Sequence, residues 1–328
     1  MSDSAGPDPA MFSSGESGYV AGLRRVVGRR TADLAIDAGE RLRGTGRRLD
    51  RLAAAGPRRS VLAVSIYRPG ATLLVRAAEE LQYSRHDVRL AFGSTGGSHL
   101  ALAPHTVVTD LAGGKFPNLN HVVARLEDGA ARAADWVLVV DDDVVLPHRF
   151  VDRFLALCEA FALDLAQPAQ TLRSHAAWRV TRRRPGSLLR RTRFVEIGPV
   201  TAFGRRAASE LLPFPEMRYG WGLDLHWAAL AEARGWRLGV ADALPVRHEQ
   251  SPVAGVYGHG DAVAETRIFL RDRPFVSSDR AQETLSAHRR LPASTRRCAD
   301  RVSWARSLET NGRSRRKMRV SATASPCP

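Results

Sequence analysis

Apolar and polar positions alternate with two different periods in the central part of the chain. Compact apolar runs, typical of buried strands, occur at Val61–Ile66, Val88–Phe92 and Trp136–Val140. Ala71–Gln82 and Asn118–Ala133, which lie between these runs, are predicted to be helices. Strands that alternate with helices predict an α/β fold with a parallel sheet, in which ligands gather at the carboxyl ends of the strands.

Similar elements are predicted farther along the chain. One more early strand is predicted at Val107–Leu111. Five later elements follow: helix Phe150–Ala162, strand Leu163–Ala166, extended segment Phe194–Phe203, helix Trp221–Arg234 and strand Trp236–Val240. The stretch Leu172–Arg193 between them is rich in arginine and has no clear period. We expect it either to bind an acidic acceptor or to form a solvated loop over the site.

The two ends of the chain are basic and differ from this central part. Tyr19–Ala55 has helical spacing and many arginines, which predicts a surface helix docked on the core or, alternatively, a helix on an anionic membrane. The residues from Arg289 onward contribute nine of the fifteen net positive charges. They predict a solvated, disordered tail, or else a polybasic segment that meets anionic lipid or nucleic acid.

These differences divide the chain into three parts. We predict a flexible arm and basic helix in residues 1–57, a single catalytic domain in residues 58–275, and a basic disordered tail in residues 276–328. Met1–Gly18 lacks the charged-then-apolar pattern of a signal peptide.

Cysteine content and hydropathy bear on location. The three cysteines have unrelated spacings, which argues against a disulfide framework and favours a reducing cytoplasm. The sequence contains no run of 18 or more apolar residues, so no transmembrane helix is predicted. We expect a cytoplasmic protein, associated with the inner face of the membrane if the basic helix binds lipid.

Three adjacent carboxylates, Asp141, Asp142 and Asp143, follow directly on the apolar run Trp136–Val140. Adjacent carboxylates repel one another unless a cation or a basic group lies close to them. Hard oxygen ligands at the carboxyl end of a strand favour Mg²⁺ or Mn²⁺, which commonly also binds substrate phosphates. The triplet therefore predicts a metal site with Asp141 and Asp143 as ligands, and a solvated acidic turn is the alternative.

In three places the sequence resembles the GT-A-fold glycosyltransferases, in particular family 2. Trp136–Val140 with its acidic triplet resembles their metal-binding motif. Gly113–Asn120 resembles the Gly-Lys…Asn segment that precedes the acidic strand. Gly220–Asp224 resembles the segment that carries the catalytic base of inverting enzymes. The resemblance covers roughly residues 60 to 255 and implies a Rossmann-type mixed sheet flanked by helices.

The resemblance also implies roles for particular residues. Lys115 and Asn120 would line the site of the nucleotide-sugar donor together with Asp141 and Asp142. Lys115 lies in a Gly-rich turn that opens a predicted helix, and such a position suits a diphosphate. Asp224 would take the proton from the acceptor hydroxyl. The alternative is that Asp224 is an acid that only favours the helix dipole.

A third metal ligand is expected from His248, because a neutral imidazole completes carboxylate sites and a histidine is found there in several GT-A families. Glu249 is a rival ligand, and His226 and His259 are weaker candidates.

Recognition of the nucleotide base is the point at which the sequence departs from the family. Many members have an acid at the end of the second strand, where this chain reads Val88–Ser94 without one. Ser65 and Tyr67, after the first strand, are candidates for binding the base. Trp178, Trp221 and Trp227 are candidates for stacking on sugars.

We therefore predict a metal-dependent hexosyltransferase that uses Mn²⁺ or Mg²⁺ and inverts the sugar. Its partners would be a nucleotide-sugar donor and a glycan, a lipid-linked molecule or another hydroxyl acceptor. A nucleotidyltransferase is one alternative, but Ile66–Gly70 lacks the Gly- and Arg/Lys-rich signature expected after its first strand. A basic nucleic-acid-binding protein is another. No recognised binding motif accompanies the charge, so we expect no specific nucleic acid partner.

Overall fold

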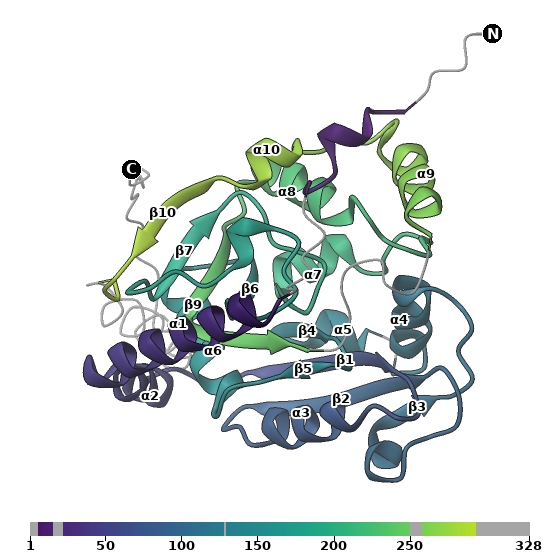
Figure 1. Cartoon of the computed structure of the whole chain (residues 1–328). Helices are drawn as coiled ribbons and strands as arrows, with labels where there is room; N and C mark the ends of the chain where they lie inside the picture. The colour runs from purple at the N-terminus through teal and green to yellow at the C-terminus, as the bar shows by residue number, and fades with distance from the viewer. Residues whose placement is uncertain (1–5, 16–21, 128, 250–257, 293–328) are drawn as a thin grey trace, which may run out of the picture. The chain divides into compact units, whose positions relative to one another are not determined.

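A mixed β-sheet runs through the computed structural model, which describes residues 6–15, 22–127, 129–249 and 258–292 (Figure 1). The strands are β1 Ser60–Tyr67, β2 Asp87–Ser94, β3 Thr106–Val108, β4 Trp136–Val140, β5 Val144–Val145, β6 Leu165–Gln170, β7 Leu189–Thr192, β8 Val200–Gly204, β9 Leu238–His248 and β10 Thr284–His288. Among the described residues their order is β10-β7-β9-β6-β8-β4-β1-β2-β3, and β5 pairs with β9 beside this path.

The two halves of the sheet differ in strand direction. β1 is parallel to both β2 and β4, as the alternation of strands and helices predicts. β8 is antiparallel to β4 and to β6, whereas β9 is parallel to β6. All five residues of β4 are buried, because helices cover both faces of the sheet there. The expected α/β fold with a mixed sheet flanked by helices is confirmed.

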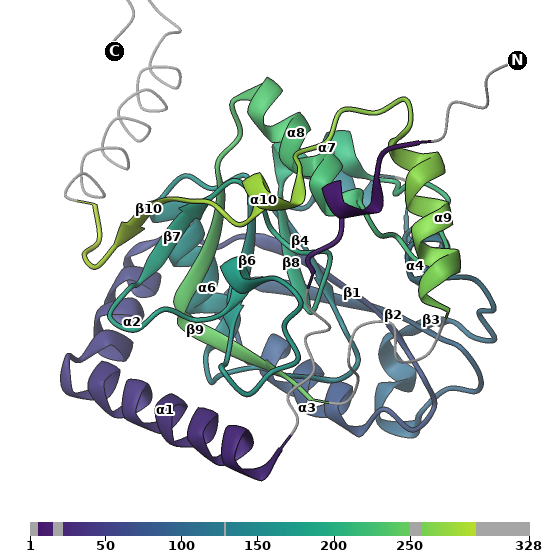
Figure 2. The same cartoon turned by 45° about the horizontal axis from the view of Figure 1, so that its top comes forward.

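Ten α-helices and three short 3₁₀ helices are present among the described residues (Figure 2). The α-helices are α1 Leu23–Leu42, α2 Thr45–Ala55, α3 Thr72–Gln82, α4 Lys115–Ala124, α5 Ala130–Ala133, α6 Phe150–Ala160, α7 Arg205–Leu211, α8 Leu223–Arg234, α9 His259–Leu270 and α10 Ser278–Ala281. The 3₁₀ helices are Pro9–Met11, Leu100–His105 and Arg179–Thr181. No helix of the described part is long and apolar enough to cross a membrane.

The apolar residues of β1 serve two layers of the core. Leu62 and Val64 belong to a buried cluster that includes Phe116 and Leu119 of α4 and residues of α7 and α8. Val61 and Ala63 are also buried, and alternation along a strand turns them toward the opposite face. A continuous apolar run is what this two-sided burial requires.

Several element boundaries differ from the prediction because tertiary contacts set them. The predicted helix Asn118–Ala133 is two helices: α4 already begins at Lys115, and α5 follows a turn with a left-handed Gly129. Only the last part of the extended segment Phe194–Phe203 is the strand β8. β9 runs eight residues past the predicted end of its strand, because β5, β6 and β7 all pair with it.

The predicted basic helix Tyr19–Ala55 is also two helices, α1 and α2, which are separated by a left-handed Gly44. The described part of the N-terminal arm is not a free segment. Phe12 is buried in the core, and Ala10 O accepts a hydrogen bond of 2.9 Å from Ser278 Oγ. This arm therefore packs against the start of α10.

The predicted domain boundary at residue 275 is too early. β10 pairs antiparallel with β7, with His288 opposite Leu189, and the first compact unit extends to Arg290. The sequence shows no sign of this pairing, because β10 is an edge strand whose single large apolar residue, Leu285, is exposed. The predicted disordered tail from residue 293 onward lies outside the described residues.

The arginine-rich stretch contributes a buried ion pair instead of only a solvated loop. The guanidinium of Arg190 forms two bonds of 2.9 Å with the Asp242 carboxylate, and both side chains are almost fully buried. Arg190 also donates to the carbonyls of Val180 and Arg182, at 2.7 Å each. This pair joins β7 to β9, and its arginine cannot bind an acceptor.

Candidate active site

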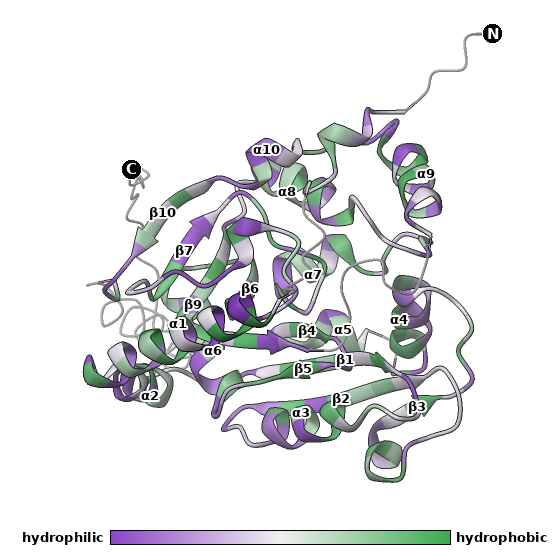
Figure 3. Ribbon diagram, in the orientation of Figure 1, coloured by the Kyte–Doolittle hydropathy of each residue, from purple (hydrophilic) through white to green (hydrophobic). Residues whose placement is uncertain are grey.

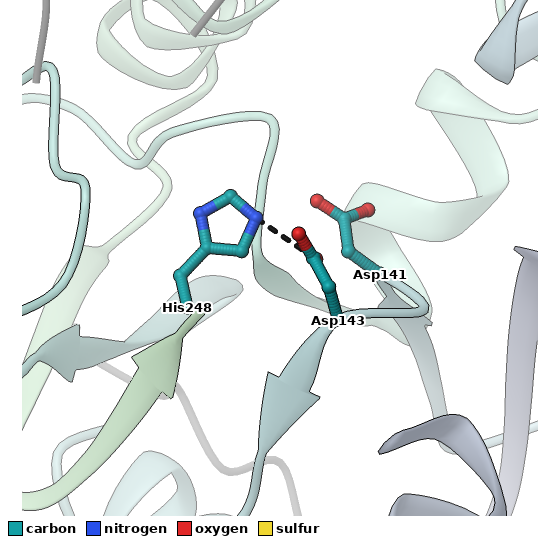
Figure 4. Close-up of side chains that lie close together, drawn as sticks. All are labelled: Asp141, Asp143 and His248. Atoms are coloured by element: carbon teal, nitrogen blue, oxygen red, sulfur yellow. Dashed lines mark ion pairs between the residues drawn. The ribbon is translucent and has the colours of Figure 1, made fainter. Parts of the chain in front are cut away.

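The acidic triplet begins where β4 ends, and its three carboxylates point to different partners. The N–H of Asp141 donates to Pro199 O at 2.9 Å, which fixes the start of the turn. Asp142 accepts a hydrogen bond of 3.1 Å from the N–H of Arg68, at the carboxyl end of β1. Asp143 is directed toward His248 (Figure 4). The turn therefore separates Asp142 from the other two carboxylates.

Asp141, Asp143 and His248 form a set of ligand atoms that all lie within 4.8 Å of one another. Strand pairing brings His248 here, since Val144 of β5 is opposite His248 of β9. The imidazole Nε2 of His248 is 2.9 Å from Asp143 Oδ1. Two carboxylates and one imidazole fit a divalent cation such as Mn²⁺ or Mg²⁺ and leave room for ligands from a substrate.

The surroundings of this set change the pKa values of its members. Burial by itself would raise the pKa of Asp143, but the hydrogen bond and the charge of His248 lower it below its usual value. Burial would lower the pKa of His248, and the Asp143 carboxylate instead raises it. Burial raises the pKa of Asp142, and the charges of Asp143 and Asp141 add to this rise. Without a cation, Asp143 and His248 thus form an ion pair.

Lys115 is the first residue of α4 and supplies the positive charge nearest to Asp141. Its Nζ is 2.5 Å from Asp141 Oδ1 and donates to Ile197 O at 2.9 Å. The preceding residue must be glycine, because a Cβ on Gly114 would lie 2.1 Å from Arg218 O. The close approach of the two backbones places the amino end of α4 beside the acidic triplet.

Asp224 lies in the first turn of α8, where the sequence predicts it, and is buried. Its Oδ1 accepts a hydrogen bond of 2.9 Å from the N–H of Leu225. Burial raises the pKa of Asp224 to about 7, although the N–H groups of Leu225 and Ile197 act in the opposite direction. Ile197 therefore contacts both Asp224, through its N–H, and Lys115, through its carbonyl.

Glu196 is a buried acid of this region that the sequence analysis did not single out. Burial raises its pKa to about 8, and the nearby Asp224 carboxylate adds to the rise. Gln170 Nε2 donates to Glu196 Oε2 at 2.7 Å. Gln170 Oε1 and Gln167 Nε2 are buried and have no hydrogen-bond partner among the described residues. The available signal was a lone carboxylate in the apolar run Phe194–Val200.

Three predicted donor-site residues are engaged in contacts within the protein. Asn120 exchanges two hydrogen bonds of 2.8 Å with the backbone of Phe214. Tyr67 is buried, and its hydroxyl is 2.8 Å from Thr106 Oγ1. Ser65 is buried in β1 as well. Their part in donor binding stays a prediction.

The other candidates differ in what surrounds them. Trp178 and Trp227 are buried in the core, which leaves them unavailable for stacking on a sugar. Trp221 packs edge-on against His259, with ring centroids 5.0 Å apart. The carboxylate of Glu249 pairs with Arg247. His226 Nδ1 lies 2.7 Å from Pro274 O, away from the triplet.

No family model and no curated protein matches the sequence. Solved structures similar to this chain include the mannosyltransferase PcManGT from Pyrobaculum calidifontis in complex with GDP-Man and Mn²⁺, at 14% identity over 66% of this chain and 67% of that one, with a TM-score of 0.41. TarS from S. aureus in complex with UDP-GlcNAc matches at 12% identity over 66% and 68%, also with a TM-score of 0.41. A mycobacterial protein matches at 16% identity over 69% and 79%, with a TM-score of 0.44.

Structural matches with such low identity and TM-score allow no conclusion about the substrate or the reaction of this chain. The chain's own sheet order, and the Asp-x-Asp pair at the carboxyl end of the central strand β4, agree with the GT-A-like fold that the sequence predicts. What the site does must therefore be inferred from its own side chains.

Proposed function

We propose that this chain is a glycosyltransferase that transfers a sugar from a nucleotide-sugar donor to an acceptor hydroxyl, with inversion and with a divalent cation. The observation that carries the proposal is that the ligand set Asp141, Asp143 and His248 has the buried acid Asp224 nearby. Ile197 bonds to both Asp224 and Lys115, the lysine paired with Asp141, and Glu196 is influenced by both Asp224 and His248. A metal site for a diphosphate and a carboxylate with a pKa near neutrality are the two groups that such a reaction requires.

The donor would be bound through its diphosphate. Asp141, Asp143 and His248 would hold Mn²⁺ or Mg²⁺, which would neutralise charge on the diphosphate as it leaves. Lys115, 2.5 Å from Asp141, adds a positive charge at the amino end of α4. Donor phosphates would exchange the Lys115–Asp141 contact for a Lys115–phosphate contact, because both acceptors are anionic oxygens.

Asp224 would act on the acceptor. As the acceptor oxygen bonds to the anomeric carbon and the bond from that carbon to the diphosphate breaks, the hydroxyl proton would pass to the Asp224 carboxylate. Its pKa of about 7 suits this task, since about half of the carboxylate is ionised at pH 7 and the ionised form is still basic enough to take a proton. Inversion would follow because the acceptor oxygen, deprotonated by Asp224, attacks the anomeric carbon from the face opposite to the departing diphosphate.

The first experiment is a binding screen with UDP-, GDP- and dTDP-linked sugars, with and without Mn²⁺, on the wild-type protein and Asp143→Ala. We expect one donor to bind in a metal-dependent way and Asp143→Ala to weaken that binding at least about tenfold, since it removes a metal ligand. Mn²⁺ binding alone, followed by electron paramagnetic resonance, gives a second readout of the same site.

Asp87→Ala is the matched control. Asp87 is exposed at the amino end of β2, whereas the acidic triplet is at the carboxyl end of β4. We expect this variant to bind the donor like the wild type. If no nucleotide sugar binds under any condition, or if Asp143→Ala binds donor and Mn²⁺ as well as Asp87→Ala does, the proposal is wrong. Release of pyrophosphate from a nucleoside triphosphate would instead support a nucleotidyltransferase.

A further inference from the structure

Helix α1 carries several large apolar side chains that the described part of the protein leaves exposed. Leu23, Leu34 and Leu42 are 80%, 59% and 88% exposed, and Val26 and Val27 are also largely exposed. At 100° per residue, Leu23, Val27 and Leu34 point in directions within roughly 40° of one another. Five of the large apolar side chains that the fold leaves exposed therefore lie on one helix. Apolar and polar stretches alternate along the ribbon of this helix (Figure 3).

The three acidic residues of α1 all have partners within the protein. Asp33 is buried and accepts hydrogen bonds from the N–H groups of Leu172 and Arg173, at 3.0 and 3.3 Å. Asp37 pairs with the buried Arg183 at 2.8 Å. Glu40, the third acid, accepts a hydrogen bond of 2.5 Å from Thr45 at the start of α2. These contacts hold α1 in a fixed rotation with its apolar residues outward.

The outer face also carries a one-sided charge. Arg24, Arg30 and Arg41 are exposed and point into the same arc of roughly 160° as the apolar residues. None of the three makes an ion pair with a residue that the structure describes. By the same count Asp37, whose side chain is 41% exposed, falls within this arc, but its carboxylate is paired with Arg183. The outer face therefore combines apolar groups with an excess of positive charge.

A hollow of about 550 Å³ continues this surface at the elbow between α1 and α2. It is lined by Arg43, Gly44, Arg47, Arg48, Asp50 and Arg51. Its acid, Asp50, is already paired with Arg149 and Arg153. The hollow is therefore strongly positive, and guanidinium groups of this density suit phosphate oxygens.

We propose that the outer face of α1, with the arginine-lined elbow next to it, lies flat on an anionic lipid membrane. Leu23, Val27, Leu34 and Leu42 enter the boundary between headgroups and acyl chains, and the arginines meet lipid phosphates. A nucleic acid would satisfy the arginines but leave the leucines in water. The excess of arginine over acid on this face is what a partner with a net negative charge requires.

The helix is long enough for this role. Its 20 residues span about 30 Å at 1.5 Å per residue. Membrane binding of this kind combines burial of apolar side chains with the attraction of arginines to anionic lipids. Salt screens only the attraction between charges, so added salt should weaken the binding without abolishing it. The proposal does not depend on the glycosyltransferase reaction, because vesicle binding requires neither a donor nor a metal.

The experiment is flotation of the full chain with vesicles of phosphatidylcholine alone and with 30% phosphatidylglycerol. Leu34→Gln combined with Leu42→Gln tests the apolar term, and we expect it to lower binding to the anionic vesicles at least about tenfold. Leu100→Gln combined with Ile268→Gln is the control, because both residues are exposed but lie elsewhere in the fold. This control should bind like the wild type.

The electrostatic term is tested by two triple variants with the same net charge. Neutralising the outer-face arginines should lower binding to anionic vesicles by about fivefold each, or about a hundredfold together. Neutralising three exposed arginines of other helices and turns should leave it nearly unchanged. The test variant replaces Arg24, Arg30 and Arg41 with glutamine. The control variant replaces Arg76, Arg125 and Arg132 with glutamine.

Three results would overturn the proposal. The wild type could fail to float with anionic vesicles. The α1 variants could float as well as their controls, which would assign the binding to other basic segments, the C-terminal residues among them. Finally, ultracentrifugation without lipid could show a dimer that Leu34→Gln with Leu42→Gln dissociates, which would make this face a protein interface. Retained circular dichroism and melting temperature confirm that the variants are folded.

Discussion

Replacing Asp224 with asparagine removes an ionisable group that the fold holds away from water. The pKa of Asp224 is raised by burial from its usual 3.8 to about 7. Each unit of difference corresponds to about 1.4 kcal/mol, so the ionised carboxylate costs the folded state about 4 kcal/mol above pH 7. The uncharged amide avoids this cost and has nearly the same shape.

The sign of the effect on stability follows from the raised pKa. Below about pH 4 the acid is protonated in both states, and no penalty exists. As the pH rises from about 4 to 7, the unfolded chain ionises first and the wild type loses stability. We therefore expect the stability gain of Asp224→Asn to grow by about 3 kcal/mol between pH 5 and 8. Loss of the Asp224 charge also removes a repulsion that raises the pKa of Glu196, which adds somewhat to this gain at the upper end of the pH range.

The assay is urea denaturation of both proteins across this pH range, together with kcat for the donor and acceptor once they are known. At pH 8 we expect Asp224→Asn to be more stable than the wild type. We also expect its kcat to be at least about a hundredfold lower, because the variant lacks the base that accepts the acceptor proton. Asp87→Asn, on an exposed carboxylate, should show neither effect. A stability difference without a pH trend would refute the argument from burial, and full activity would refute the role as base.

Three further predictions concern the fold and the second buried acid. Asp242→Asn should destabilise the protein by about 3–5 kcal/mol in urea denaturation, because it leaves the buried guanidinium of Arg190 without its partner charge. Gly220→Ala should lower the melting temperature by several degrees, since its φ is +73° and a Cβ would lie 2.0 Å from the ring of Phe116. Glu196→Gln should keep most activity at pH 7, where the acid with a pKa of about 8 is largely protonated, and should remove a decline in kcat that we expect in the wild type above pH 8.

Local patterns determined the central strands and the acidic triplet. The apolar run Trp136–Val140 is the strand β4 over the same five residues, and Asp141–Asp143 follow its carboxyl end as predicted. Lys115 begins a helix and Asp224 lies in the first turn of another, as the glycines before them suggest. These features depend on neighbours within a few residues, which a sequence displays directly.

Contacts between distant segments were decided by the tertiary structure. His248 meets Asp143 because β5 and β9 pair in one register, with Val144 opposite His248 across about a hundred residues of chain. A shift of one residue would turn the imidazole to the other side of the strand, and no local pattern fixes that register. In the sequence, His248 was a candidate ligand only through the chemistry of imidazole and a family resemblance, and not through any local pattern.

Burial, too, depends on the whole fold, and it separates residues that look alike in the sequence. Glu196 and Asp224 have raised pKa values because several elements exclude water around them, whereas Asp87 is exposed. Among the arginines, Arg190 is buried against Asp242, while Arg24 is left outside on α1. The sequence by itself determined which charged groups the chain has and which strands carry them. The packing of strands and helices decided which of those charges lie in water and which must find a partner, because desolvation is set by everything that surrounds a side chain.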